Sequence, residues 1–286
     1  MSIVVTGATG HLGRLVVESL LTAGVPAGGI VAGARNEEKA AGLAARGVEV
    51  RVVDYDRPET LAEAFRAGDR VLLISASEPG RRVPQHSAVI DAARAAGVAQ
   101  LAYTGVLGGP EADFDLAADH KETERLILGS GLPYTFLRNG FYTEVYTENL
   151  APVLEHGAVV ANAGEGRIGS AARADFAAAA AAVLTGDGHL NTAYELSGDT
   201  AWSLAEYAAE LSRQTGRTIR YDNVPGEVRL GILTGAGVPE ALAAILVDVD
   251  HAMERGRLAG GTGDLARLIG RPTTPLAESV AEALKA

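Results

Sequence analysis

Short apolar runs rich in β-branched residues alternate with amphipathic stretches through residue 140. The runs have the length of strands, and the stretches between them place apolar residues at helical spacing. Strands are predicted at residues 2–6, 29–34, 48–53, 70–75, 100–104 and 133–138, and helices at 12–23, 58–67, 85–96 and 119–130. Apolar strands joined by helical crossovers indicate a parallel sheet that is covered on both faces. The pattern therefore predicts a doubly wound α/β fold with ligands at the carboxyl ends of the strands.

The pattern changes after residue 140. Residues 141–157 are predicted to be helical, 174–184 form an alanine-rich helix suited to close packing on a sheet, and 192–198 form a further strand. From residue 202 onward the chain is mainly helical. We expect a Rossmann-type domain at 1–138, continued by about 158–198, and a small, mainly helical C-terminal lobe on the substrate side at about 139–157 and 199–286.

The segment "VVTGATGHLGRLV", residues 4–16, places three glycines three apart directly behind the first strand. Gly7 permits a tight turn, Gly10 lets a pyrophosphate approach the backbone N–H groups, and Gly13 allows close packing of helix on strand. The helix N-terminus adds about half a positive charge toward a phosphate. This context favours dinucleotide binding, with a bare tight turn as the alternative. The cofactor-binding stretch is predicted as Gly7, Ala8, Thr9, Gly10, His11, Leu12 and Gly13.

The second strand indicates which dinucleotide is bound. NAD sites place a carboxylate about 20 residues beyond the glycines, but this strand ends in "AGARNEEKA" with Arg35 and Asn36. A guanidinium suits a 2′-phosphate, so Arg35 favours NADP(H), and a solvated surface arginine is the alternative. After the third strand, Asp54 is a candidate partner of the adenine amino group or a cap for the helix at residue 58. Small residues that let a flat cofactor lie against the backbone follow strands four and five, at Ser75, Ala76, Ser77 and Thr104.

Charge and cysteine content narrow the classes of function. The formal net charge of −11 argues against nucleic acid or an anionic membrane as the main partner. The chain has no cysteine, which excludes disulfides and thiolate chemistry, and its histidines lack metal-ligand spacing. The start "MSIVVTG" shows no signal segment, and the longest apolar run, "FAAAAAAVL", is too short to span a bilayer. We expect a cytoplasmic protein with no bound metal and no membrane association.

The catalytic pair of ketone-reducing short-chain dehydrogenases is missing. In those enzymes a lysine four residues after a tyrosine lowers the tyrosine pKa so that the tyrosine moves a proton. None of the eight tyrosines has this partner. In the region where the pair is expected, the chain reads "DLAADHKETERLI", in which Asp119 is the expected helix cap. His120 is a weak catalytic candidate there, and a core histidine is an equally good interpretation.

An acceptor that needs no proton from the enzyme fits this gap. A quinone is such an acceptor, because its carbonyls are conjugated and the reduced anion takes a proton from water. The exit of strand six, "LRNGFYTEVY", offers Phe141, Tyr142 and Tyr146 as a planar wall, with Asn139 and the Gly140 backbone as hydrogen-bonding groups for a carbonyl. Tyr142 is the second weak catalytic candidate. The alternative is that these aromatic residues are core between the lobes.

Motifs along the chain resemble the type 2 NAD(P)H:quinone oxidoreductases, which are flavin-free members of the NmrA-like, atypical short-chain dehydrogenases. They are "GATGHLG", "LLISASEPGRRVPQH", "AYTG", "YTFLRNGFYTE", "ARADFAAAAAAVL", "YELSGDTAWSL" and "LIGRPTTPLAESV". The resemblance runs from residue 2 to about 284 and implies NADPH as cofactor, no flavin, and reduction of a quinone or similar planar acceptor. It also implies phosphate contacts at Gly7 to Gly13, a 2′-phosphate contact at Arg35 and cofactor contacts at Ser75, Ala76 and Ser77. The nicotinamide and substrate region is implied at Arg138, Asn139, Gly140, Phe141, Tyr142, Thr143 and Arg173.

One departure leaves the acceptor open. After Tyr103 and Thr104 the chain has Gly105 and Val106, where the quinone reductases carry Ser-Leu, and "AYTG" is similar to the related triphenylmethane dye reductases. Three functions therefore remain: a quinone reductase, a reductase of other conjugated acceptors such as these dyes, and a non-catalytic NADP(H)-binding redox sensor of NmrA type. A homo-oligomer is possible in each case.

Overall fold

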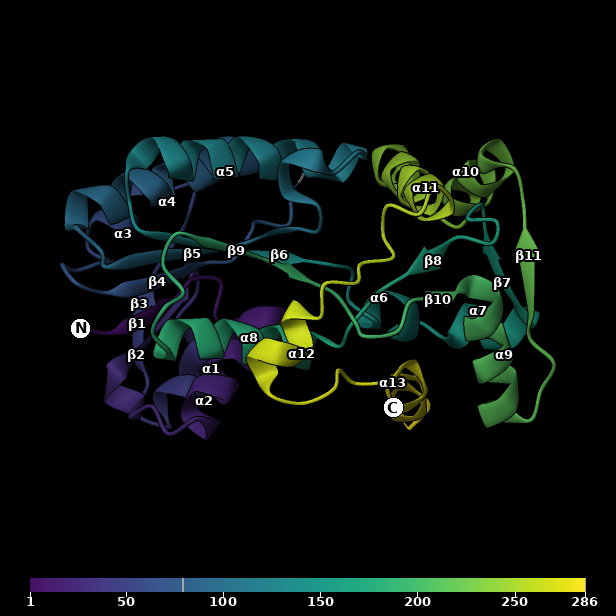
Figure 1. Cartoon of the computed structure of the whole chain (residues 1–286), viewed down its shortest axis with the longest axis horizontal. Coiled ribbons are helices and arrows are strands. Elements are labelled where there is room, and N and C mark those ends of the chain that lie inside the picture. Colours follow the sequence, from purple (N-terminus) through teal and green to yellow (C-terminus); the bar gives the residue numbers. More distant parts are fainter. Residues whose placement is uncertain (79, 286) are drawn as a thin grey trace.

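A computed structural model describes residues 1–78 and 80–285 (Figure 1). Its main body is a seven-stranded parallel sheet with the order β3-β2-β1-β4-β5-β6-β9. The strands are β1 (Ile3–Val5), β2 (Ile30–Ala34), β3 (Glu49–Val52), β4 (Arg70–Leu73), β5 (Gln100–Val106), β6 (Tyr134–Asn139) and β9 (Thr192–Leu196). The strand order reverses between β1 and β4, which is the point at which doubly wound sheets bind ligands. The predicted α/β fold is confirmed.

Helices cover both faces of the sheet (Figure 1). One face carries α3 (Pro58–Ala62), α4 (Arg82–Ala96) and α5 (Ala118–Ser130), and the other carries α1 (His11–Thr22) and α8 (Arg173–Thr185), with the short α2 (Ala41–Ala44) nearby. Alternation along β1 explains this arrangement, since Val4 packs with α4 and α5 while Ile3 and Val5 pack with α1 and α8. Short 3₁₀ helices lie at Ala27–Gly29, Glu38–Ala40, Gly109–Glu111 and Asp115–Ala117.

A second lobe has its own hydrophobic core around Trp202, Tyr207 and Met253. Its elements are α6 (Glu144–Thr147), α7 (Ala151–His156), β7 (Ala158–Ala161), β8 (Arg167–Ile168), β10 (Trp202–Ser203), α9 (Leu204–Thr215), β11 (Arg220–Asn223), α10 (Gly226–Gly235), α11 (Glu240–Glu254) and α13 (Leu276–Ala283). Here β7 pairs with β11 and β8 pairs with β10. Residues 158–168 therefore belong to this lobe, and placing them in the Rossmann domain was wrong. Their partners lie some 34 to 62 residues further along the chain, beyond the reach of local pattern.

The C-terminal segment returns to the Rossmann body before it ends in the lobe. Helix α12 (Asp264–Ile269) packs against α8, where Leu265 is fully buried, and α13 then packs into the lobe (Figure 1). On the way, Thr262 Oγ1 donates to the Glu195 carbonyl at 2.7 Å, and the Glu195 N–H donates to the Asp264 carboxylate at 3.0 Å. The outer edge of β9 is thus covered by side chains. Residues 271–274, which we call the C-terminal strap, join α12 to α13.

Two further predictions concern helices. The helix predicted at 58–67 ends at Ala62, because the chain then turns and the Ala64 carbonyl accepts from the buried Arg51 guanidinium at 2.6 Å. None of the helices in the described ranges is long and apolar enough to cross a membrane.

Candidate functional site

The glycine-rich turn between β1 and α1 is shaped by contacts that exclude side chains. Gly7 has φ of +61°, a conformation that residues with a Cβ rarely adopt. A Cβ on Gly13 would lie 2.2 Å from the Gly7 carbonyl oxygen, so α1 begins hard against the turn. Gly10 is the N-cap of α1, which starts without a capping side chain from the described residues. The positive end of α1 therefore faces the space above the turn.

A pocket of about 480 Å³ opens above this turn. It brings together most of the predicted cofactor residues with two from the predicted substrate region. The predicted residues that line it are Gly7, Thr9, Gly10, His11, Leu12, Gly13, Arg35, Ser75, Ala76, Ser77, Tyr142 and Arg173. Sequence reasoning missed other lining residues, which are Lys39, Val53, Tyr55, Asp56, Ile74, Glu78 and Gln85.

Two cations lie at the β2 side of the pocket. Arg35 directly follows β2 and is exposed, and Lys39 follows one turn later in the 3₁₀ helix Glu38–Ala40. Arg14 links this segment to the glycine turn, because its guanidinium donates to the carbonyls of Thr9 and Lys39 at 3.1 Å each. The four-residue spacing of Arg35 and Lys39 in "ARNEEKA" was the available signal for the second cation.

Two of the predicted cofactor residues lie outside the pocket lining. Ala8 is fully buried, and its N–H donates to the Gly33 carbonyl at 2.9 Å. Asp54 closes the turn before α3, where its carboxylate accepts from the Asp56 N–H at 3.1 Å and its own N–H donates to Thr60 Oγ1 at 3.0 Å. The helix-start alternative for Asp54 is thus the better interpretation, and the neighbouring Tyr55 and Asp56 reach the pocket instead.

The loop after β4 is held from behind by buried polar groups. The Ser75 N–H donates to Thr104 Oγ1 at 2.9 Å, and the Ala76 N–H donates to His86 Nε2 at 3.0 Å. Thr104 is itself buried and does not line the pocket. Arg82 Nε donates to the Ala76 carbonyl at 2.7 Å. Thr104 therefore supports the pocket wall instead of facing a ligand.

His120 lies in the same buried layer, away from the pocket. Its Nδ1 is 2.7 Å from the Tyr103 hydroxyl, and burial lowers the pKa of His120 to about 3. Burial likewise lowers the pKa of His86 to about 3. Asp119 is not a helix cap, because it lies inside the first turn of α5 and its carboxylate accepts from the Gly80 N–H at 2.8 Å. The core interpretation of His120 is the one that its position favours.

At the exit of β6, Arg138 and the Gly140 backbone are already bound within the protein. Arg138 points away from the pocket and is held between Glu124, at 2.8 and 2.9 Å, and Glu195, at 2.8 Å. These carboxylates, Glu124 foremost, raise the pKa of Arg138. The Gly140 N–H donates to the Leu196 carbonyl at 2.7 Å, so it is not available to a substrate carbonyl. Asn139 is buried beside it, with Oδ1 unpartnered among the described residues. Arg138 and Gly140 are therefore structural, and placing them in the substrate region was wrong.

The aromatic residues after β6 divide between core and pocket. Phe141 packs on Phe114, and Tyr146 packs on Trp202 and Tyr207 in the lobe core, as the core alternative expects. Thr143 is also buried, with its hydroxyl 2.8 Å from that of Ser170. Of the predicted aromatic wall, Tyr142 lines the pocket.

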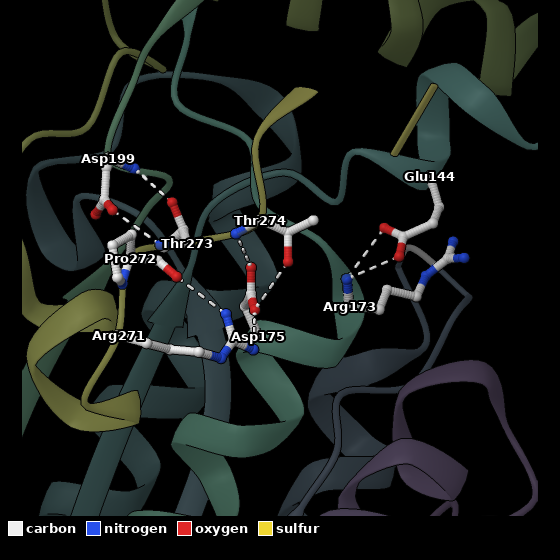
Figure 2. Close-up of polar contacts among 8 residues, drawn as sticks. All are labelled: Glu144, Arg173, Asp175, Asp199, Arg271, Pro272, Thr273 and Thr274. Carbon is white, nitrogen blue, oxygen red and sulfur yellow. Dashed lines mark hydrogen bonds and ion pairs between the residues drawn. The ribbon is translucent and has the colours of Figure 1, made fainter. Parts of the chain in front are cut away.

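Tyr142 and Arg173 form one wall of the pocket. The Tyr142 ring lies edge-on to Phe176. The Arg173 guanidinium lies 5.2 Å from the centroid of the Tyr142 ring. Burial raises the pKa of Tyr142. The Arg173 guanidinium is paired with Glu148, whose carboxylate also lies 4.0 Å from His11 Nδ1. The Arg173 N–H donates to both carboxylate oxygens of Glu144, at 2.9 and 3.1 Å (Figure 2).

Gly105, the departure from the quinone reductase pattern, faces away from the pocket. A Cβ at this position would lie 3.3 Å from Glu124 Oε1 and 3.5 Å from Tyr103 Cε1. A serine there would meet the buried Glu124 before any ligand in the pocket. The identity of residue 105 therefore acts on the supporting layer and not on the pocket wall.

The described residues form a further hollow, which contains none of the predicted site residues, and no metal-binding cluster. A hollow of about 520 Å³ between α10 and α11 is lined mainly by apolar atoms, and Glu227, Asp248 and His251 are among its lining residues. Within residues 1–78 and 80–285, no group of three or more histidine, aspartate or glutamate side chains is arranged to hold a metal ion.

The chain is similar in sequence and structure to known proteins over nearly its whole length. The model of the NmrA-like family matches residues 1–256. Quinone oxidoreductase 2 of Escherichia coli is 47% identical over 97% of both chains. The crystal structure of the E. coli NADPH-dependent quinone oxidoreductase QOR2 complexed with NADPH matches with a TM-score of 0.96, at 46% identity over 99% of both chains. The Citrobacter sp. triphenylmethane reductase complexed with NADP(H) matches with a TM-score of 0.94, at 43% identity over 99% of this chain and 100% of that chain.

Proposed function

Because the chain belongs to the NmrA-like family, we propose that it is an NADPH-dependent, flavin-free reductase that passes a hydride to a quinone-type acceptor. The observation that carries this proposal is the pocket at the strand-order reversal, where the glycine turn, Arg35 and Lys39 meet. Its support from relatives is the 47% identity to E. coli quinone oxidoreductase 2 over nearly the whole of both chains. A non-catalytic NADP(H) sensor, the alternative, would bind the cofactor in the same pocket but would reduce no acceptor.

The residues present fit NADPH. Gly7 and Gly13 hold a turn that no side chain fills, and the amide groups at the start of α1 suit a diphosphate. Arg35 and Lys39 supply two positive charges for the 2′-phosphate. Ser75, Ala76 and Ser77 give a low wall for the flat nicotinamide part. We assign these groups to the cofactor.

Tyr142 and Arg173 are assigned to the acceptor end of the pocket. When bound, NADPH supplies the hydride. The Tyr142 ring offers a flat apolar surface against which a planar acceptor packs, and the Arg173 guanidinium offers hydrogen bonds and positive charge to a reduced oxygen. Burial raises the pKa of the Tyr142 hydroxyl, which makes this hydroxyl a weaker proton donor, and His120 is buried away from the pocket. Positioning, not proton donation, is thus the contribution of this chain, and the anion left by hydride transfer takes its one remaining proton from water.

Triphenylmethane dyes are the second candidate acceptors. The specific observation in their favour is "AYTG" with Gly105, together with the 43% identity to the Citrobacter enzyme. Because Gly105 faces Glu124 and not the pocket, we rank the dyes below quinones.

The test is NADPH oxidation followed by near-UV absorbance against a panel of quinones and dyes, with binding of NADPH titrated in parallel. We expect binding, and turnover with quinones. Turnover with dyes alone would move the assignment to the second candidate. Tight binding without turnover of any acceptor would contradict the enzyme and leave the sensor.

A further inference from the structure

The C-terminal strap is fixed to the first turn of α8 by one buried carboxylate. Asp175 is fully buried, and both of its oxygens accept hydrogen bonds from the strap (Figure 2). Arg271 Nη2 donates to Oδ1 at 2.6 Å, the Thr274 N–H donates to Oδ2 at 2.7 Å, and Thr274 Oγ1 donates to Oδ1 at 3.2 Å. An aspartate this deep is held only because these donors replace its water.

The same turn of α8 carries a residue of the pocket. Arg173 is the first residue of α8, two positions before Asp175, and lines the pocket with its side chain 13% exposed. Its N–H is held by Glu144 of α6 (Figure 2). The start of α8 is therefore held by Glu144 from one side and by the strap from the other, and Arg173 has little freedom to move relative to Tyr142.

The strap has a second anchor that does not involve α8. The Thr273 N–H donates to Asp199 Oδ2 at 2.8 Å, and the Asp199 N–H donates to Thr273 Oγ1 at 2.9 Å (Figure 2). Asp199 follows β9 and lines no part of the pocket. It provides a control carboxylate that binds the same strap from outside α8.

We propose that Asp175 is a positioning residue of the cofactor pocket, which fixes Arg173 against the bound dinucleotide by anchoring the C-terminal strap to α8. Arg173 lies between Tyr142 at the acceptor end and the start of α1, because its partner Glu148 also lies 4.0 Å from His11 Nδ1. The same guanidinium therefore also meets the diphosphate of the cofactor. The proposal rests on the proposed function to the extent that the ligand is NADPH. It predicts a role for residues beyond 256, where the match to the family model ends.

The test is a double-mutant cycle on NADPH binding with the full chain. Asp175→Asn keeps the shape and removes the charge, and we expect it to raise the NADPH Kd about tenfold, as for loss of a charge-assisted contact. In the Arg173→Ala background the same change is expected to alter Kd by less than about twofold, because the residue through which it acts is gone. NADH is expected to lose as much affinity as NADPH, because Arg173 does not reach the 2′-phosphate.

Control variants separate this role from a merely structural one. Asp199→Asn is expected to change Kd by less than about twofold; an effect as large as that of Asp175→Asn would assign the role to the strap as a whole. Equal losses in both backgrounds would overturn the proposal. If Asp175→Asn does not fold, Arg271→Ala replaces it, because Arg271 is half exposed, and Arg267→Ala on α12 is its matched control. A wild-type protein that binds no NADPH would instead contradict the proposed function.

Discussion

Arg35 and Lys39 place two cations at the tip of β2, where the chain has no carboxylate directly after the strand. Arg35 is exposed and free to adapt to a ligand. A hydrogen bond between a guanidinium and a phosphate is among the strongest that a surface pocket offers. The preference for NADPH over NADH therefore depends on one or two side chains.

Arg35→Glu is expected to weaken NADPH binding more than NADH binding by roughly 2–4 kcal/mol, since a charged contact is lost and repulsion is added. Lys39→Ala is expected to act in the same direction with a smaller effect. Titration of both cofactors by fluorescence measures the difference. Equal loss for the two cofactors would show that Arg35 does not contact the 2′-phosphate.

Tyr142 distinguishes a positioning mechanism from a proton-donating one. Tyr142→Phe keeps the ring and is expected to lower turnover less than about tenfold, whereas general acid catalysis contributes about 10²–10⁴-fold. Tyr142→Ala removes the wall and is expected to raise the quinone KM. Steady-state kinetics with saturating NADPH measure both. A hundredfold loss in the Phe variant with NADPH binding intact would make Tyr142 the proton donor.

At the scale of elements, the features that depend on residues close together in the chain were predicted from the sequence. Short apolar runs rich in β-branched residues identified the strands from β1 to β6, and the glycine spacing identified the turn before α1. Arg138 was misplaced because its partners Glu124 and Glu195 lie 14 and 57 residues away on α5 and β9, so nothing near it in the chain indicates burial. Tyr146 was misplaced for the same reason, since Trp202 and Tyr207 enclose it from the far lobe.

The layer between β5 and the helices α4 and α5 holds two histidines that stay neutral. Burial lowers the pKa of His86 and of His120 to about 3, below the value of an unfolded histidine. As the pH falls, these histidines are therefore protonated in the unfolded chain before they are protonated in the folded protein. The free energy of unfolding consequently decreases below about pH 6.5, the pKa of a histidine in the unfolded chain. Each histidine is expected to remove about 1.4 kcal/mol of the free energy of unfolding between about pH 7.5 and pH 5.5.

Urea denaturation at the two pH values measures this loss. His86→Gln is expected to remove about half of it. His156→Gln on α7, where the histidine is exposed, is the control and is expected to leave it unchanged. A pH dependence that is the same in wild type and His86→Gln would show that His86 is not neutral in the folded protein.

At the scale of the molecule, two cores are joined by a chain that crosses between them repeatedly. The lobe core contains Trp202, the single tryptophan, and Val280 of α13, which is fully buried. α12 packs on the Rossmann body directly before the strap leads into α13. Unfolding of the lobe is therefore expected to be coupled to unfolding of the Rossmann body.

We expect tryptophan fluorescence, which reports on the lobe, and far-UV circular dichroism, which reports on the whole chain, to give coincident urea transitions. Val280→Ala is expected to lower the free energy of unfolding by about 1–3 kcal/mol and to shift both curves together. Lys285→Ala, at an exposed position, is the control. A fluorescence transition at lower urea than the circular dichroism transition would mean that the lobe unfolds alone.

The side chains of Thr262 and Asp264 that bind the outer edge of β9 affect how copies of this protein can associate. An open edge strand is a template on which a second copy adds its own strand. At one edge of this sheet, Thr262 and Asp264 already occupy the backbone groups of Glu195. At the other, β3 carries Glu49 and Arg51, charged residues of the kind that discourages such pairing. Copies of this protein are therefore expected to meet through helices or the lobe, and a chain cut before Thr262 is expected to aggregate through the uncovered strand.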